Sequence, residues 1–397
     1  MGCPLVDQHP PVKESDQNFA RHEIAIIGGG PSGSTAAIYL AELGFDVCLI
    51  EKKIFPRDIL CGEFLSREVV NNLKEMNLFS TFLNLKPNPI NSFTLFDDNK
   101  TISAQLDFQA YGLRRSAFDN LLLTSAKAKG VIVYQPFEVS EINKKPNNYE
   151  LSLRSSTHSS QVIFSRYVVA AYGKRNHLDT KLKRKFISYK SNRDGIKYHV
   201  NKKYLKNIND DQIQIYTADG IYCGVNSVSD EDVTFCFLED RTDVSRTPVQ
   251  SLERLANRNS SFKSLFNSEI RNVFSSNRVY GSGDIFFGKR NKVENGIFMI
   301  GDAAQVIAPL AGDGISMAMD SAKLLANLFH DKKQKNISDA HLHGRYDAEW
   351  QKYFNKRLRI ALFIQNVLFT NAGRRIGLGG LHYFPQALKF FIKNTRG

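Results

Sequence analysis

The feature that most constrains the fold of this chain is a glycine-rich turn between an apolar run and a helical pattern. Residues 24–27 form a short apolar, largely β-branched run of the kind found in buried parallel strands. Gly28, Gly30 and Gly33 follow at once in a GxGxxG pattern, and Pro31 stands where the first turn of a helix tolerates proline. This spacing predicts a strand that turns sharply into a helix.

The next residues complete a predicted β–α–β unit. Apolar residues recur at helical spacing over 36–43, Gly44 ends the helix, and residues 47–50 form a second apolar run that ends in Glu51. A carboxylate at this distance accepts hydrogen bonds from a ribose, while the N–H groups of the helix N-terminus attract phosphate. The unit does not distinguish NAD from FAD, and it predicts a dinucleotide site made by Gly28, Gly30, Pro31, Ser32, Gly33, Glu51 and Lys52.

A second glycine-bearing segment lies in the C-terminal third of the chain. An apolar run at 297–300 leads into Gly301-Asp302, and a small-residue turn from Pro309 then enters a helix near Gly314. An aspartate at a strand end suits a hydrogen bond to a ribityl hydroxyl. The turn would direct helix N–H dipoles at an electron-rich ring.

Together these segments resemble the FAD-dependent superfamily that contains the aromatic-ring hydroxylases (para-hydroxybenzoate hydroxylase-like) and the geranylgeranyl reductases. The segment FPRDILCGEFLS (55–66) is similar to the reductase-branch segment beside the flavin ring, and LAGDGISMAM is similar to that branch's flavin loop. Arg115 in RRSAFDNLLLTSAKAKG matches the family arginine at the diphosphate and ribityl side. The resemblance therefore implies an FAD site that also includes Cys61, Gly62, Arg115, Gly301, Asp302, Pro309, Gly312, Asp313, Gly314 and Ile315.

Three features depart from the families concerned. Tyr172-Gly173 stands where ring hydroxylases usually show an Asp-Gly pair, which argues against the usual nicotinamide-handling role of that segment. YCGVNSV (222–228) replaces the reductases' aromatic and Phe-Pro substrate motif, which argues against prenyl binding in the standard arrangement. Flavin halogenases are disfavoured because the single tryptophan, Trp350, lies in no tryptophan-rich motif.

The expected fold class is α/β (α+β), with a Rossmann-like FAD-binding domain, an inserted antiparallel β-sheet substrate domain and C-terminal helices. Alternating runs such as IQIYTA and VTFCFL between about 186 and 237 indicate the inserted sheet. The predicted boundaries are a flexible leader at 1–22, a discontinuous FAD-binding domain at 23–180 and 280–335, a substrate-binding domain at 181–279 and a C-terminal helical region at 336–397.

The leading functional hypothesis is oxygen-dependent hydroxylation of a large apolar or aromatic substrate, such as a polyketide or phenolic lipid, with NAD(P)H as electron donor. The alternatives are saturation of isoprenoid double bonds and a non-catalytic flavin-binding subunit. Cys61 is the candidate catalytic residue, because the resemblance brings its thiol near the ring. No metal site is predicted, because the sequence shows no ligand cluster.

Charge and cysteine content constrain the partners and the compartment. The formal charge of +13 is densest between residues 181 and 203, which either forms an ordinary solvated face or attracts an acidic carrier protein or an anionic membrane surface. No nucleic-acid partner is expected. The five cysteines are scattered and odd in number, so a reducing, cytoplasmic compartment is expected. The aromatic and basic tail at 381–397 adds peripheral membrane contact as an alternative.

Overall fold

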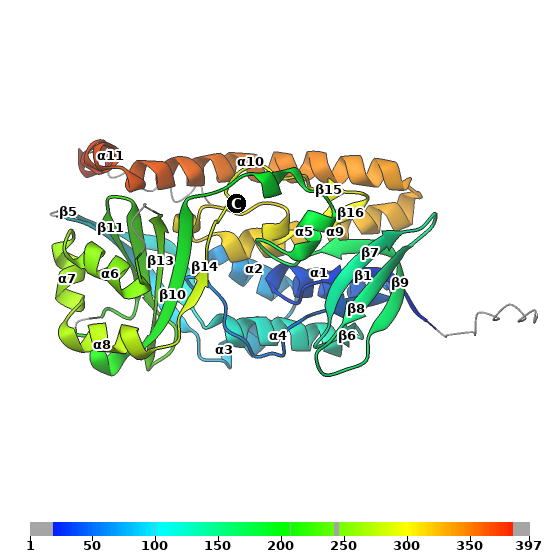
Figure 1. Ribbon diagram of the computed structural model, residues 1–397, viewed down its shortest axis with the longest axis horizontal. Helices are drawn as coiled ribbons and strands as arrows, with labels where there is room; N and C mark the ends of the chain where they lie inside the picture. Colours follow the sequence, from blue (N-terminus) through cyan, green and yellow to red (C-terminus); the bar gives the residue numbers. More distant parts are fainter. Residues whose placement is uncertain (1–18, 99, 207, 242–245, 384–397) are drawn as a thin grey trace, which may run out of the picture.

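The structure is a computed structural model that describes residues 19–98, 100–206, 208–241 and 246–383. Most of the predicted leader and of the C-terminal tail lies outside these residues. The described chain contains two eight-stranded sheets that lie side by side and are bridged by a long helix (Figure 1). This arrangement confirms the predicted fold class.

The first sheet is built around the strand that precedes the glycine turn. β1 (Ala20–Ile27) lies between β2 (Val47–Ile50) and β9 (Gln161–Ala170) and is parallel to both. Its apolar residues 24–27 are almost fully buried, as expected for a strand covered on both faces. The remaining strands are β6 (Ile132–Tyr134), β7 (Glu138–Lys144), β8 (Tyr149–Arg154), β15 (Val293–Glu294) and β16 (Ile297–Met299).

Helices pack against the first sheet and against one another. α1 (Pro31–Glu42), which follows the glycine turn, contacts both α4 (Arg115–Ala128) and α9 (Gly314–Lys335). Residues 115–170 form α4 followed by strands β6 to β9. The smaller helices of this half are α2 (Arg67–Glu75), α3 (Phe79–Leu83) and α5 (His177–Lys181).

The second sheet is mostly antiparallel and has the order β14-β10-β13-β12-β11-β4-β5-β3. The alternation at about 186–237 correctly predicted its central strands. The sheet also contains strands outside the predicted substrate-binding domain at 181–279, namely β3, β4 and β5 from residues 64–112 and β14 at residues 280–282. The strands are β3 (Phe64–Leu65), β4 (Asn88–Asp97), β5 (Lys100–Gly112), β10 (Arg193–Asn201), β11 (Gln212–Ala218), β12 (Ile221–Ser227), β13 (Asp232–Asp240) and β14 (Tyr280–Ser282).

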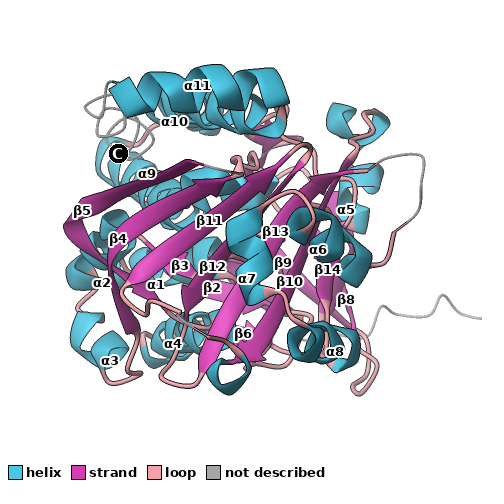
Figure 2. Cartoon of the chain, turned by 90° about the vertical axis from the view of Figure 1, so that its left-hand side faces the viewer, coloured by secondary structure: helices cyan, strands magenta, loops and turns pink. Residues whose placement is uncertain are grey.

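The two faces of the second sheet have different surroundings. α6 (Pro248–Ala256), α7 (Ser260–Leu265) and α8 (Ser268–Ser276) cover the outer face (Figure 2), where Phe235, Phe262 and others form a buried cluster. The inner face is directed toward the glycine-rich loops of the first half. A substrate site between the two halves can therefore form only on the inner face.

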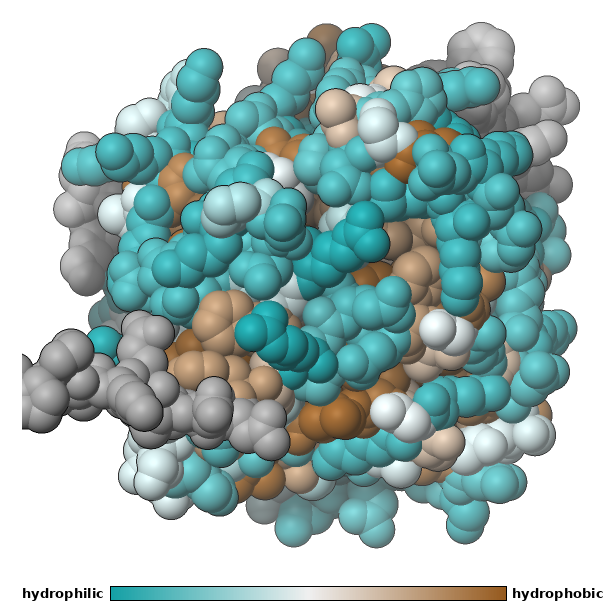
Figure 3. Space-filling model, turned by 90° about the vertical axis from the view of Figure 1, so that its right-hand side faces the viewer, coloured by the Kyte–Doolittle hydropathy of each residue, from teal (hydrophilic) through white to brown (hydrophobic). Residues whose placement is uncertain are grey.

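The C-terminal helices tie the halves together. α10 (Asp339–Phe369) runs along both sheets, and α11 (Asn371–Tyr383) follows it (Figure 1). The buried Trp350 of α10 lies under the Lys292 ammonium, 3.9 Å from its ring centroid. Polar residues cover most of the face shown in Figure 3. Among the described residues, every helix is too short or too polar to cross a bilayer.

Candidate flavin-binding site

The glycine turn after β1 has the close contacts that its sequence predicts. Gly28 has a φ of +108°, and a Cβ there would lie 2.6 Å from the carbonyl oxygen of Ala171. A Cβ on Gly33 would lie 1.8 Å from the carbonyl oxygen of Gly28. At Gly30 the nearest atom to an added Cβ is 4.0 Å away, on Arg57. The turn therefore packs tightly against the protein on one side and leaves Gly30 open on the other, which fits a diphosphate at the start of α1.

The predicted ribose acceptor is held beside this turn. Glu51 is buried at the end of β2, where one carboxylate oxygen accepts a hydrogen bond from the Gly29 amide and the other from the Lys53 amide, both at 2.8 Å. These bonds fix the carboxylate and leave acceptor capacity for ribose hydroxyls. Lys52, by contrast, pairs with the partly exposed Glu138, with 3.3 Å between Nζ and Oε1.

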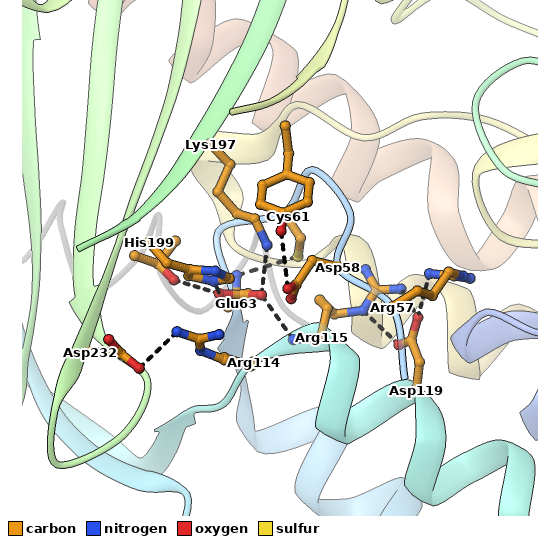
Figure 4. Close-up of polar contacts among 12 residues, drawn as sticks. Arg57, Asp58, Cys61, Glu63, Arg114, Arg115, Asp119, Lys197, His199 and Asp232 are labelled. Carbon is orange, nitrogen blue, oxygen red and sulfur yellow. Dashed lines mark hydrogen bonds and ion pairs between the residues drawn. The ribbon is translucent and has the colours of Figure 1, made fainter. Parts of the chain in front are cut away.

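Two arginines share one buried carboxylate next to the turn (Figure 4). Arg115 binds Asp119 in a bidentate manner, with Nε and Nη2 at 2.7 and 2.8 Å from the two oxygens. Arg57 reaches the same carboxylate at 3.2 Å and lies 3.8 Å from Glu51. Sequence reasoning missed Arg57, although it lies in the flavin-side segment 55–66. Its guanidinium faces Gly30, so it is placed to hold the diphosphate.

The loop that carries Cys61 lies between α4 and the second sheet. The Cys61 sulfur accepts a hydrogen bond from the Glu63 amide at 3.3 Å, and the thiol is partly exposed. Burial alone would lower the pKa of the neighbouring Arg115. Asp119 and Cys61 have the larger effect and raise this pKa above its usual value. At Gly62 no atom lies within 4 Å of an added Cβ. The Cys61-Gly62 backbone therefore lines an open space, as expected for a segment beside a flavin ring.

Glu63 connects this loop to the second sheet. One carboxylate oxygen accepts hydrogen bonds from the Lys197 ammonium at 2.8 Å and from the Arg115 amide at 2.9 Å. The other oxygen accepts from Thr234 and lies 2.6 Å from Nε2 of His199. Burial alone would raise the pKa of Glu63, but His199 and Lys197 lower it to about 2. The carboxylate therefore stays ionised at neutral pH.

The positions of Lys197 and Arg184 limit the interpretation of the basic stretch. Lys197 is fully buried against Glu63, and Arg184 is buried against Asp179 at 2.9 Å. Residues 181–203 therefore do not form one continuous solvated patch. A carrier-protein or membrane partner for the remaining lysines stays a prediction.

Asp58, Glu63 and His199 bring one possible metal-ligand atom each to within 4.8 Å of one another. The Lys197 ammonium, however, already binds Glu63 at 2.8 Å. A second cation beside this buried positive charge would be repelled. This group is therefore better explained as a hydrogen-bonded ion cluster than as a metal site.

The C-terminal glycine segment meets the N-terminal turn. Gly301 has a φ of +58°, and a Cβ there would lie 2.7 Å from the hydroxyl oxygen of Ser32. The partly exposed Asp302 therefore stands beside the first turn of α1. In the loop at 309–314, Gly312 has a φ of +69° and lies against Phe64. Sequence reasoning thus correctly predicted that these distant segments converge.

Two predicted residues of this loop have buried side chains. Asp313 is fully buried and Ile315 is 6% exposed. If they contact a flavin, they do so through backbone N–H groups at the start of α9, together with Gly314. Their individual roles, like those of the other predicted site residues, stay predictions.

Tyr172 supports the second segment from behind. Its hydroxyl donates a hydrogen bond to Asp179 at 2.7 Å, and Arg184, which pairs with Asp179, donates to the carbonyl oxygen of Ala303 at 2.9 Å. The buried Lys292 donates to the carbonyl oxygen of Ala304 at 3.2 Å, and its burial lowers its pKa to about 7. Tyr172, which stands in place of the aspartate of the Asp-Gly pair, therefore packs among the residues that support the flavin loop.

A family model described as "FAD binding domain" matches residues 21–353, which include every element of this site up to the middle of α10. The chain belongs to this FAD-binding family. It is an enzyme of the FAD-dependent oxidoreductase superfamily that includes aromatic hydroxylases, halogenases and geranylgeranyl reductases.

Curated relatives in this superfamily carry different activities. The tryptophan 2-halogenase of Chondromyces crocatus is 26% identical over 373 residues, which cover 88% of this chain and 68% of the relative. The digeranylgeranylglycerophospholipid reductase of Methanosarcina mazei is 23% identical over 374 residues, which cover 87% of this chain and 84% of the relative. The halogenase alignment spans most of the chain, so tryptophan content alone does not separate this protein from that branch.

Solved structures show the same fold. The myxobacterial chondrochloren halogenase superposes with a TM-score of 0.72 at 19% identity, covering 88% of this chain and 82% of the other. A Pseudomonas aeruginosa protein, PqsL, named as a probable FAD-dependent monooxygenase, gives a TM-score of 0.70 at 13% identity, covering 89% and 98% of the two chains. These likenesses concern the fold alone.

We predict that Arg57→Gln weakens FAD binding because it removes a charge-assisted contact to the diphosphate. A loss of about 1.5–3 kcal/mol corresponds to a roughly tenfold to hundredfold higher Kd. Fluorescence titration of the apoprotein with FAD measures this change. Lys129→Gln, at the exposed end of α4, is the control and should retain the wild-type Kd; equal Kd values for both variants would remove Arg57 from the site.

We also predict that Glu63→Gln destabilises the protein in a pH-dependent manner. At neutral pH the variant leaves the buried Lys197 without its counter-charge, which costs about 3–5 kcal/mol of unfolding free energy. Because the folded pKa of about 2 lies below the ordinary value of 4.5, the contribution of Glu63 is present above pH 4.5 and is lost as the pH falls toward 2.

Urea unfolding at several pH values measures this difference. The gap between wild type and Glu63→Gln should narrow below about pH 4.5, whereas the exposed variant Glu75→Gln should stay close to wild type throughout. A gap that is constant with pH would contradict the assignment of this ion cluster.

Proposed function

We propose that the protein is an oxygen-dependent flavin enzyme that hydroxylates a large apolar or aromatic substrate, with NAD(P)H as the electron donor. The main support is the apolar surface that Ile215 and Leu310, partly exposed members of one packed cluster, present between the second sheet and the flavin loop. Leu95 of β4, Ile215 of β11 and Leu310 of the flavin loop pack in one cluster with Leu368 of α10. Such a surface favours a substrate with little charge.

When bound, FAD supplies the redox chemistry, because reduced flavin can transfer electrons to oxygen. The protein's own residues have three tasks. Arg57 and the glycine turn hold the dinucleotide, the Cys61-Gly62 backbone borders the ring, and the apolar surface orients the substrate and excludes water. No step in this scheme requires a metal ion.

Halogenation is a second candidate function. It is favoured by the tryptophan 2-halogenase whose alignment covers 88% of this chain. Both functions use the same flavin site and an apolar or aromatic substrate. They differ in whether the product gains an oxygen or a halogen atom.

An oxygen-pulse experiment tests the proposal. The FAD-loaded protein is reduced under anaerobic conditions and then mixed with isotopically labelled oxygen and 2-naphthol, with or without chloride or bromide. Incorporation of labelled oxygen into 2-naphthol supports hydroxylation, whereas halide-dependent incorporation of halogen supports the second candidate. Reoxidation of the flavin by geranylgeraniol without oxygen would instead favour alkene reduction, and an inert flavin would favour the non-catalytic alternative.

We predict that Cys61→Ser retains bound FAD but slows turnover, because the thiol lies where it can adjust hydrogen bonding at the ring. Loss of one such interaction corresponds to a roughly threefold to tenfold lower kcat. Cys61→Ala separates the effect of hydrogen bonding from that of side-chain size. The flavin absorbance gives the bound FAD and stopped-flow kinetics give the turnover; unchanged kinetics in both variants would exclude Cys61 from the chemistry.

A further inference from the structure

Three neighbouring strands of the second sheet each have one partly exposed residue between buried residues. Between its end residues, β13 is buried except at Cys236. The adjacent β12 is buried except at Gly224. The next strand, β11, is partly exposed at Ile215, between buried residues. These partly exposed residues lie within the strands rather than at the strand ends.

The three residues form one row across the sheet. Gly224 lies directly opposite Cys236 in the pairing of β12 with β13, and opposite Ile215 in the pairing of β11 with β12. Residues directly opposite each other on neighbouring strands point to the same face. The three partly exposed residues therefore form one opening on one face of the sheet.

This opening lies on the flavin side of the sheet. Lys197, which lies opposite Cys236 in the pairing of β10 with β13, binds Glu63 in the flavin-side loop. Ile215 at the other end of the row packs in one cluster with Leu310 of the flavin loop. The aromatic cluster under α6–α8 contains Phe235 and Phe237, which flank Cys236 and point to the opposite face.

The residues of the opening are partly buried rather than fully exposed. Cys236 is partly exposed in this opening, and burial raises the pKa of its thiol to about 12, so the thiol presents no charge there. A Cβ added to Gly224 would meet one atom within 4 Å, the carbonyl oxygen of Cys236 at 3.7 Å. A larger side chain at Gly224 would therefore project into the opening.

We propose that an uncharged aromatic ring system of the substrate lies flat on the row Cys236–Gly224–Ile215, and that Gly224 sets the size of ring system that fits. The inference rests on the proposed function, because it places the substrate of that site. A glycine lets a ring approach the strand backbone closely, and Ile215 provides an apolar edge. The adjacent Lys197 is paired with Glu63, so this lysine offers no free charge to an anionic substrate.

Substitution at Gly224 tests this inference without straining the strand, since its φ is not in the left-handed region. Binding of phenol and of 2-naphthol to the FAD-loaded protein is measured by difference spectroscopy of the flavin. Gly224→Leu should weaken 2-naphthol binding at least tenfold. Gly224→Ala should weaken the binding of 2-naphthol more than that of phenol, because a single methyl group makes the space shallower without filling it.

The matched control is Gly281→Leu, on the edge strand β14 of the same sheet, where the residue is exposed. It should change both affinities less than twofold. Wild-type affinity for 2-naphthol in Gly224→Leu, or no 2-naphthol binding by wild type, would overturn the inference. Loss of FAD from Gly224→Leu alone would also overturn it, because Gly224 would then belong to the flavin site.

The proposed function has a separate test. A wild-type protein that binds FAD and transfers oxygen or halogen, while Gly224→Leu behaves as wild type, contradicts this inference alone. A wild-type protein whose flavin is inert contradicts the proposed function whatever the Gly224 variants bind.

Discussion

The Glu63 carboxylate is the contact on which the relation between the two halves of the protein depends. It accepts a hydrogen bond from the backbone amide of Arg115, at the start of α4. It also accepts hydrogen bonds from the side chains of Lys197 and Thr234 in the second sheet. A charge this deeply buried is tolerated only because each oxygen has several partners. The same contacts fix the position of Cys61 and Gly62, which immediately precede Glu63, and so determine where the flavin edge and the substrate sheet face each other.

The flavin site itself combines steric and electrostatic constraints from distant segments. Gly28 and Gly33 allow strand, turn and helix to pack at contact distance, and Gly301 closes against Ser32 from the other end of the chain. Arg57 and Arg115 place two positive charges around one carboxylate, Asp119. Arg57 also lies 3.8 Å from Glu51, and its remaining N–H donors suit the diphosphate of a dinucleotide. Behind the flavin loop, buried cations bind backbone carbonyls and hold the turn in place.

The substrate side is defined by what the second sheet lacks. Its inner face is apolar near Leu95 and Ile215, and its central row is opened by a glycine. Two polar residues nearby, Lys197 and His199, are both engaged with Glu63. An uncharged ring is therefore a better match to this face than an anionic substrate. Hydroxylation and halogenation both remain compatible with such a ring, because the chemical outcome depends on small groups around the flavin rather than on the fold.

The sequence by itself determined the dinucleotide-binding unit, the second flavin segment and the fold class, because glycine spacing and apolar periodicity are local signals that leave few alternative structures. It did not predict the extension of the substrate sheet by β3–β5, or the role of Arg57. Nor did it predict the ion cluster at Glu63, in which Lys197 comes from a stretch that resembled a solvated basic face. Only the tertiary structure decided these features, since strand pairing and buried charge compensation join residues far apart in the chain. The sequence around Gly224 likewise did not predict that this residue is partly exposed. Its exposure depends on the register of three strands and on the loop packed above them, and a local sequence pattern contains neither.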